Sequence, residues 1–316
     1  MIDITSIQET TIDGYHVERS LRQLQMVELD LLKELLRVCS KHHLRVFADS
    51  GTLLGAVRHQ GFIPWDDDID IAMPRPDYDR LAELAPQEFA HPYFFQNTYT
   101  DPLHVRGHAQ LRNSETTAIL ETEIHLDINQ GVFVDIFPLD GVPDEEARQE
   151  RDKASMAQLL QVMRYNRPFR LPVTWNPVKI LRYVRERRQA LRFLRQRGWN
   201  NKDCFKAFED ILRSTDYESA QRVSTLGFWY RRFKPHAIYD GVVMMKFEDI
   251  EIPAPVGYDA LLRIFFGDNY MTPIHESACH TGLIYDVAQP YAVAQERLRQ
   301  EHSWWKDFMG EIKKRI

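Results

Sequence analysis

Apolar residues recur at helical spacing over several long segments of the chain. In the clearest one, residues 17–39, they follow one another at steps of three and four and form one helical stripe. The stripe consists of Leu24, Val27, Leu31, Leu35 and Val38. Similar patterns, with residues typical of helix starts and ends, predict helices at 52–59, 77–85, 144–163, 177–197, 203–213, 258–266 and 295–316.

Short runs of apolar residues predict strands between these helices. LRVFAD at 44–49 and GVFVDIF at 131–137 are typical of buried strands. Residues 65–72 alternate between acidic and apolar side chains, as in a strand with one face buried. A further strand is expected at 103–112, and a pair of strands at 242–252.

The order of these elements predicts an α+β protein with a mixed sheet and flanking helices. Strands concentrate in the first part of the chain, and the second part is mainly helical. We place a soft boundary between residues 1–148, which form the core with an N-terminal helix, and residues 149–316, which complete that core.

The bulk composition is that of a soluble globular protein. Of the 316 residues, 44% are hydrophobic and 27% are charged, and 40 basic against 46 acidic residues give a net charge of −6. This acidic balance argues against nucleic acid as a partner. No apolar run reaches the roughly 18 residues of a membrane span, and the N-terminus lacks signal-peptide features. We therefore expect a cytoplasmic protein without a transmembrane segment.

Four carboxylates crowd the stretch DDDID at 66–70. On a strand, Asp66, Asp68 and Asp70 would share one face, and Asp67 would point with the isoleucines to the other. Adjacent carboxylates stay ionised at low cost only when a cation lies between them. An all-oxygen ligand set selects Mg²⁺ or Mn²⁺, which commonly join carboxylates to substrate phosphates. The stretch therefore indicates a metal site for phosphoryl transfer.

A glycine turn lies just upstream of the acidic stretch. Ser50, Gly51 and Thr52 follow a predicted strand and start a predicted helix. Glycine lets the backbone approach a ligand closely, and N–H groups at a helix start suit phosphate oxygens. Asp135 is the candidate for a third carboxylate, because its apolar neighbours anchor it in the sheet. The alternative is a solvated acidic loop, although a calcium loop would not place Ile69 among its ligands.

Three stretches resemble motifs of one family. DSGTLLGAVRHQGFIPWDDDIDIAMPRPDYDRL closely resembles the signature of the LicD family, which includes fukutin and fukutin-related protein. GVFVDIFPLDGVPD resembles the family's next motif, and FEDIEIPAPVGYDALLRIFFGDNYMTP resembles its C-terminal motif. With the preceding helix, the resemblance covers residues 20–145 and 240–275.

The resemblance implies a nucleotidyltransferase-like fold and a phosphotransferase activity. Family members move a phospho-alcohol, such as phosphocholine or ribitol phosphate, from a CDP-activated donor to a glycan. The implied cofactor is Mg²⁺ or Mn²⁺, and the implied partners are a CDP-alcohol donor and an acceptor glycan of a cell-surface polysaccharide or lipopolysaccharide. We expect residues 149–316 to bind the acceptor. The zinc-binding insertion of fukutin-related protein is not evident, so the bacterial branch is the nearer match.

The resemblance also assigns roles to single residues. Asp68 and Asp70 are implied as the paired metal ligands, with Asp135 as the third carboxylate. Gly51 and its two neighbours are implied as the turn that faces the donor phosphates. Two roles stay open for Asp135, which can ligate metal or accept the proton of the attacking hydroxyl.

Three further residues are candidates for donor binding. Arg58 and Arg112 have guanidinium groups that match phosphate oxygens with paired donors. A surface ion pair is the alternative for each arginine. Trp65, next to the acidic stretch, either walls the site and stacks on the cytosine or packs into the core.

The predicted helix 177–197 is strongly basic. Leu181, Val184, Leu191 and Leu194 form an apolar stripe, and eight lysines and arginines surround it against one acidic residue, Glu186. Such a helix can lie on an anionic membrane near a lipid-linked acceptor, at the inner face of the membrane. The alternative is a packed stripe with a solvated basic face.

Two other functions are compatible with these motifs. A protein of this fold can transfer a nucleotidyl group from an NTP to a small molecule. A catalytically dead relative can serve as a glycan-binding protein. The intact set of Asp68, Asp70, Asp135 and Gly51 favours the phosphotransferase.

Overall fold

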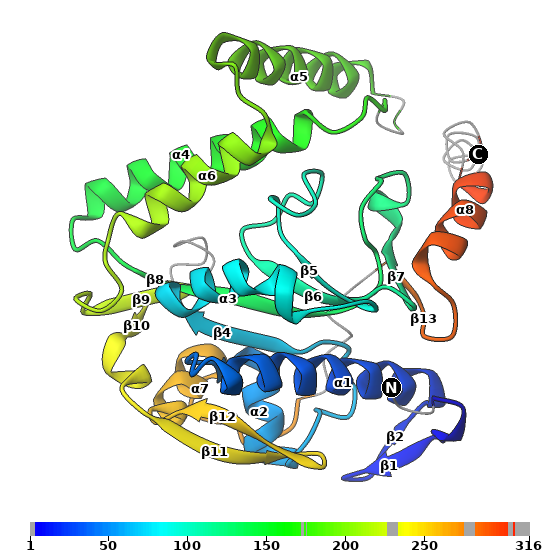
Figure 1. Cartoon of the computed structure of the whole chain (residues 1–316), viewed down its shortest axis with the longest axis vertical. Coiled ribbons are helices and arrows are strands. Elements are labelled where there is room, and N and C mark those ends of the chain that lie inside the picture. The colour runs from blue at the N-terminus through cyan, green and yellow to red at the C-terminus, as the bar shows by residue number, and fades with distance from the viewer. Residues whose placement is uncertain are drawn as a thin grey trace.

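A mixed sheet of seven strands organises the chain. The strands are β3 (Phe47–Ala48), β4 (Asp70–Pro74), β5 (Tyr93–Gln96), β6 (Ala109–Asn113), β8 (Val132–Gly141), β9 (Arg222–Thr225) and β10 (Lys234–Pro235). They follow the order β10-β9-β8-β4-β3, and β6 joins β5 to β8 (Figure 1). β4 and β8 are parallel, and the other pairs are antiparallel. The computed structural model describes residues 4–171, 174, 176–225, 233–274, 282–302 and 306.

Helices lie on both sides of this sheet (Figure 1). They are α1 (Arg19–Lys41), α2 (Ser50–His59), α3 (Arg75–Glu88), α4 (Glu146–Tyr165), α5 (Pro177–Arg197), α6 (Asn201–Arg213), α7 (Tyr258–Phe266) and α8 (Tyr291–Glu301). Three short antiparallel pairs complete the fold. They are β1 (Thr10–Ile12) with β2 (Tyr15–Val17), β7 (Thr117–Leu120) with β13 (Leu283–Asp286), and β11 (Val242–Phe247) with β12 (Ile250–Pro255). The 3₁₀ turns are η1 (Ile4–Ser6), η2 (Glu121–Glu123) and η3 (His236–Tyr239).

The two faces of the central sheet differ in chemistry. Tyr93 donates a hydrogen bond to Asp30 on α1, which identifies the face that α1 covers. Residues at alternate positions share a face, and register partners on neighbouring strands do so too. The α1 face is therefore apolar, and its members are Phe95, Leu111, Val134, Ile136 and Ile71, all buried. The opposite face carries polar side chains, and α4, α5 and α6 lie on that side in Figure 1.

The β11–β12 hairpin fixes the loop that leads to the acidic stretch. Glu248 at its turn has a left-handed backbone, with φ of 55°, and its carboxylate accepts two bonds from Arg22 on α1, at 2.6 and 3.1 Å. The same carboxylate accepts the Phe62 N–H, and the Glu248 N–H donates to Gln60. A Cβ on Gly61 would lie 2.5 Å from Glu248 Oε1, so any other residue would push this carboxylate away from its partners.

Two hydrophobic clusters support the sheet and the helices beside it. The larger one combines α1, the central strands and residues from Tyr217 to Val287. The second joins α4, α5 and α6 with Val105 and Val142. Residues after 148 contribute to both clusters. The boundary at residue 148 stays a prediction.

Most predicted elements are present, and an α+β fold with a mixed sheet is confirmed. The helices at 177–197 and 258–266 have the predicted bounds. Asn176 caps the first by accepting the N–H groups of Val178 and Lys179, and Gly198 ends it with φ of 65°. The helix predicted at 295–316 corresponds in part to α8, which begins at Tyr291 and ends at Glu301, and residues 303–305 and 307–316 lie outside the described part.

The strand predicted at 65–72 is only partly correct. Pairing begins at Asp70, so the first three aspartates precede the strand and lie in a loop. Among the described residues, none of the helices has the length and apolar character needed to span a membrane.

Candidate active site

A row of polar side chains crosses the sheet on the face opposite α1. Asp70 on β4 is the register partner of Asp135 on β8, which in turn pairs with Gln110 on β6 and, through it, with Gln96 on β5. On the other side of β4, the Asp49 N–H donates to the Asp70 carbonyl at 3.1 Å. Two carboxylates predicted from separate motifs therefore sit side by side on parallel strands.

The acid loop, Asp66–Asp68, precedes β4 and does not follow the alternating pattern expected from the sequence. Ligand atoms of Asp66, Asp67 and Asp68 all lie within 4.8 Å of one another, so Asp67 does not point away from its neighbours. The Asp66 N–H donates to Ile63, and Gln25 on α1 donates to the Asp66 carbonyl. These bonds turn the backbone away from strand geometry, and strand alternation no longer applies.

Electrostatics in the acid loop favours uptake of positive charge. Burial and the charge of Asp68 raise the pKa of Asp66 to about 8. Burial, followed by the charges of Asp68 and Asp135, also raises the pKa of Asp70 well above its usual range. Carboxylates with raised pKa values bind either protons or a cation, and a hard divalent ion matches their oxygen atoms.

Glu28 on α1 adds a carboxylate that the sequence analysis missed. It is 2% exposed, and its Oε2 has no hydrogen-bond partner among the described residues. Burial and then the charges of Asp68, Asp67 and Asp66 raise its pKa. A buried carboxylate oxygen without a partner is costly unless a cation satisfies it. The donor set around the acid loop therefore fits Mg²⁺ or Mn²⁺.

The glycine turn lies directly against the acid loop. A Cβ on Gly51 would lie 2.6 Å from Asp66 Oδ2, so any other residue would displace that carboxylate. Thr52 Oγ1 accepts the Asp70 N–H at 2.8 Å and fixes the start of β4. Ser50, the first residue of α2, has φ of 45°, an uncommon conformation that clusters at functional sites. The structure thus brings together the glycine turn and the acidic stretch, the two halves of the first sequence motif.

Asp135 is held by neighbours on β6. His108 Nε2 lies 2.9 Å from Asp135 Oδ1, and Gln110 Nε2 donates to the same oxygen at 2.7 Å. Burial raises the pKa of Asp135, but His108, Arg106 and the Gln110 hydrogen bond outweigh it and lower the pKa. Asp135 therefore holds its negative charge more readily than Asp70 does. His108, Gln110 and Arg112 alternate with apolar residues, a signal that was visible in the sequence.

Arg112 is a buried support of this row. Its guanidinium donates to Gly131 O at 2.6 Å, to Gln110 Oε1 at 2.5 Å and to Gln96 Oε1. Burial and then the charge of Arg106 lower its pKa to about 9. The structure therefore places Arg112 behind Gln110, which it orients toward Asp135. Neither of the two roles expected for Arg112, a phosphate clamp and a surface ion pair, matches this buried position.

Arg58 and Trp65 lie together at the end of α2. Arg58 donates to His59 Nε2 and to the Tyr270 carbonyl, at 2.8 and 3.0 Å. The Trp65 ring makes edge contacts with Tyr15 and His59 and packs against the larger hydrophobic cluster. Trp65 thus makes the contacts expected of a residue that packs into the core. It remains only half-buried beside the acid loop.

Asp49 and Lys234 form a buried pair beneath the glycine turn. Lys234 on β10 is fully buried, and its Nζ lies 3.5 Å from Asp49 Oδ2. The same ammonium lies 4.6 Å from the centre of the Phe265 ring. Lys234 stands outside the sequence motifs, and only the pairing of β9 with β10 brings it here.

Comparisons with known proteins identify similar sequences. Residues 43–181 match the family model described as LicD/FKTN/FKRP, nucleotidyltransferase domain. The chain is 28% identical over 270 residues to lipopolysaccharide cholinephosphotransferase LicD of Haemophilus influenzae, covering 81% of this chain and 94% of that protein. Shorter matches of 57 residues are 46% identical to a protein of Rickettsia prowazekii and 44% identical to one of Rickettsia typhi. Each covers 18% of this chain, and 21% and 18% of the relative. The stretch that matches the LicD-family nucleotidyltransferase domain, residues 43–181, includes the acid loop, Asp70 and Asp135.

Proposed function

We propose that the protein is a metal-dependent phosphotransferase that moves a phospho-alcohol from a CDP-activated donor to a glycan. The observation that carries the proposal is the register of Asp70 with Asp135, next to the acid loop and the glycine turn. The relative from Haemophilus influenzae, named a lipopolysaccharide cholinephosphotransferase, supports phosphocholine as the group and lipopolysaccharide as the acceptor.

Asp68, Asp70 and Asp135 are the proposed ligands of Mg²⁺ or Mn²⁺, with Glu28 and Asp66 close by. The bound ion supplies charge neutralisation for the donor pyrophosphate and its CMP leaving group. Gly51 leaves room for the donor beside the acid loop, and the α2 N-terminus with Ser50 faces its phosphates. Asp135, held by His108 and Gln110, ligates the ion or accepts the proton of the attacking glycan hydroxyl in this proposal.

Product analysis tests this proposal against nucleotidyl transfer. The protein is incubated with CDP-choline and lipopolysaccharide, or with CTP and phosphocholine, in the presence of Mg²⁺ or Mn²⁺. We expect CMP from the first mixture and no pyrophosphate from the second. Pyrophosphate without CMP would show a nucleotidyltransferase, and neither product, with no cation binding, would favour the dead glycan-binding protein.

We also propose that α5 contacts an anionic membrane at its inner face, where a lipid-linked acceptor is presented. α5 packs against α4, and only Ala190 and Leu194 of its described side chains are buried. Val178 and Leu181 are each 70% exposed, so the apolar stripe is open to solvent over its first turns. Exposed apolar residues within a basic helix match an anionic lipid surface. This role supplements the cytoplasmic location proposed from the sequence.

A further inference from the structure

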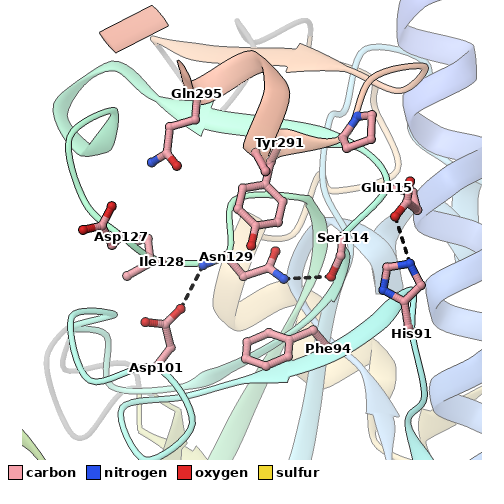
Figure 2. Close-up of a pocket in the computed structure, with 12 residues that line it drawn as sticks. His91, Phe94, Asp101, Ser114, Glu115, Asp127, Ile128, Asn129, Tyr291 and Gln295 are labelled. Carbon is pink, nitrogen blue, oxygen red and sulfur yellow. Dashed lines mark hydrogen bonds and ion pairs between the residues drawn. The ribbon is translucent and has the colours of Figure 1, made fainter. Parts of the chain in front are cut away.

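A cavity lies at the β5 edge of the sheet, on the same face as Asp135. Its volume is about 720 Å³, and it lies between β5, the loop at 127–129 and the start of α8 (Figure 2). Its lining includes Phe94, Asp101, Ser114, Asn129 and Tyr291. These residues are distinct from the proposed metal ligands, and nothing in the family motifs assigns the cavity a role.

The cavity presents fixed polar atoms. Asp101, 8% exposed, accepts the Gln96 amide at 2.8 Å and the Asn129 N–H at 2.9 Å, both on Oδ2. Asn129 Nδ2 donates to Ser114 Oγ at 2.8 Å. Within the described part of the chain, no donor reaches Asp101 Oδ1 and no acceptor is bonded to the Tyr291 hydroxyl. A ligand with hydroxyl groups can satisfy both atoms.

Two aromatic rings border these polar atoms. In Figure 2 the Asn129–Ser114 pair lies between the rings of Tyr291 and Phe94. Both rings are half-buried, so parts of them remain open. Aromatic faces beside a few oriented hydrogen-bonding groups suit a sugar, which has apolar C–H faces and polar edges.

A buried hydrogen-bonded chain joins this cavity to the candidate active site. Asp101 accepts from Gln96, Gln96 and Gln110 both accept from Arg112, and Gln110 donates to Asp135. The cavity strand β5 and the Asp135 strand β8 are separated by β6, so about 10 Å lies between them. A glycan reaching the active site therefore can have a neighbouring sugar unit in the cavity.

We propose that this cavity binds a neutral sugar unit of the acceptor glycan. The assignment of this sugar to the acceptor glycan rests on the proposed function. The binding of a neutral sugar by the cavity does not. The cavity carries the carboxylates of Asp101, Glu115 and Asp127. Glu115 is paired with His91 at 2.8 Å and Asp127 with Arg299 at 2.6 Å, whereas Asp101 accepts its two bonds from the neutral groups of Gln96 and Asn129. We therefore expect the Asp101 carboxylate to repel uronic acids and phosphorylated sugars.

Titration by saturation-transfer NMR tests the proposal without donor or cation. The probes are methyl β-glucoside, methyl β-galactoside and N-acetylglucosamine, with glucuronate as the charged comparison. We expect saturable binding of at least one neutral probe and none of glucuronate. Tyr291→Ala should weaken that binding at least about tenfold, Tyr291→Phe less, and the control Tyr183→Ala on α5 should not change it.

The possible results separate this inference from the proposed function. Asp68→Asn should retain sugar binding while losing donor turnover, because the cavity does not use the acid loop. If the wild type binds sugar but produces no CMP, the proposal of a sugar site stands and the proposed phosphotransferase activity is overturned. Absence of binding by every neutral probe, equal binding of glucuronate, or unchanged affinity in folded Tyr291→Ala would each overturn the sugar site.

Discussion

Asp70 and Asp135 are direct register partners on the parallel strands β4 and β8. Their environments differ, because burial and neighbouring carboxylates raise the pKa of Asp70, whereas His108 and its neighbours lower that of Asp135. Two adjacent carboxyl groups with opposite shifts can serve different roles, one dependent on a cation and one ionised without it.

Replacing His108 should impair the orientation of Asp135. His108→Phe keeps the aromatic contact with Phe137 and removes the contact with Asp135 Oδ1. Loss of a group that orients a metal ligand typically lowers affinity or activity by 10–100-fold, so we expect CMP release to fall by about that factor. His108→Gln should retain more activity, and His16→Phe, at an exposed histidine, should have none of this effect. Equal rates for His108→Phe and the wild type would contradict the assigned role.

Acid should destabilise the protein through His104. This side chain is 1% exposed, and burial followed by the charge of Arg106 holds its pKa well below 6.5. Below pH 6.5 the unfolded state binds a proton at His104 that the folded state does not bind. The free energy of unfolding therefore falls as the pH decreases, by up to about 1.4 kcal/mol per pH unit.

Urea unfolding of the wild type and His104→Leu between pH 7 and pH 5 measures this contribution. The variant should show a smaller loss of stability over that interval, whatever its stability at pH 7. Parallel pH profiles of the two proteins would show that His104 does not carry the effect.

A buried ion pair joins β8, α3 and α6. Asp140 is fully buried and accepts from Arg75 at 2.6 and 2.8 Å, and Arg75 also donates to Glu209. Asp140→Ala leaves the Arg75 charge buried and partly unpaired, so the free energy of unfolding should fall by about 3–5 kcal/mol. Asp210→Ala breaks the exposed pair with Lys206 and should cost less than about 1 kcal/mol. Chemical denaturation compares them, and similar costs would refute the assignment.

Membrane contact by α5 should depend on its exposed apolar residues. Leu181→Asp should weaken binding to vesicles of phosphatidylglycerol and phosphatidylcholine by about tenfold or more, because it removes buried hydrocarbon and adds repulsion. The matched control is Val242→Asp, at a residue that is 51% exposed on β11. Vesicle sedimentation measures both variants. Binding that is insensitive to Leu181→Asp, or equally sensitive to the control, would argue for a solvated helix.

The sequence predicts elements well where local residues define their ends. Asn176 and Gly198 mark the ends of α5, and the structure reproduces both bounds. The strands β5, β9 and β10 are short and were missed, because their stability comes from partners distant in sequence rather than from local pattern. The start of β4 was misplaced because Gln25, on α1, holds the acid loop in another conformation.

The candidate site was likewise predicted in part. The structure brings Gly51, Asp68, Asp70 and Asp135 into one region, whereas Arg112 faces inward as a support. Glu28 was interpreted only as part of a helix, and Lys234 had no local motif, so neither was identified. A single sequence reveals which residues suit the chemistry, and the fold decides which of them face one another.

Transfer of labelled phosphocholine is the most direct measurement of the central claim. CDP-choline labelled in the choline methyl groups is incubated with lipopolysaccharide and Mg²⁺ or Mn²⁺, and label in the glycan is counted with CMP release. Parallel reactions use EDTA, Asp70→Asn and the exposed-site control Asp210→Asn. We expect equal amounts of CMP and glycan-bound label from the wild type and the control, with both products lost in EDTA and in Asp70→Asn. Transfer that persists in EDTA or in Asp70→Asn would contradict the proposed metal-dependent mechanism.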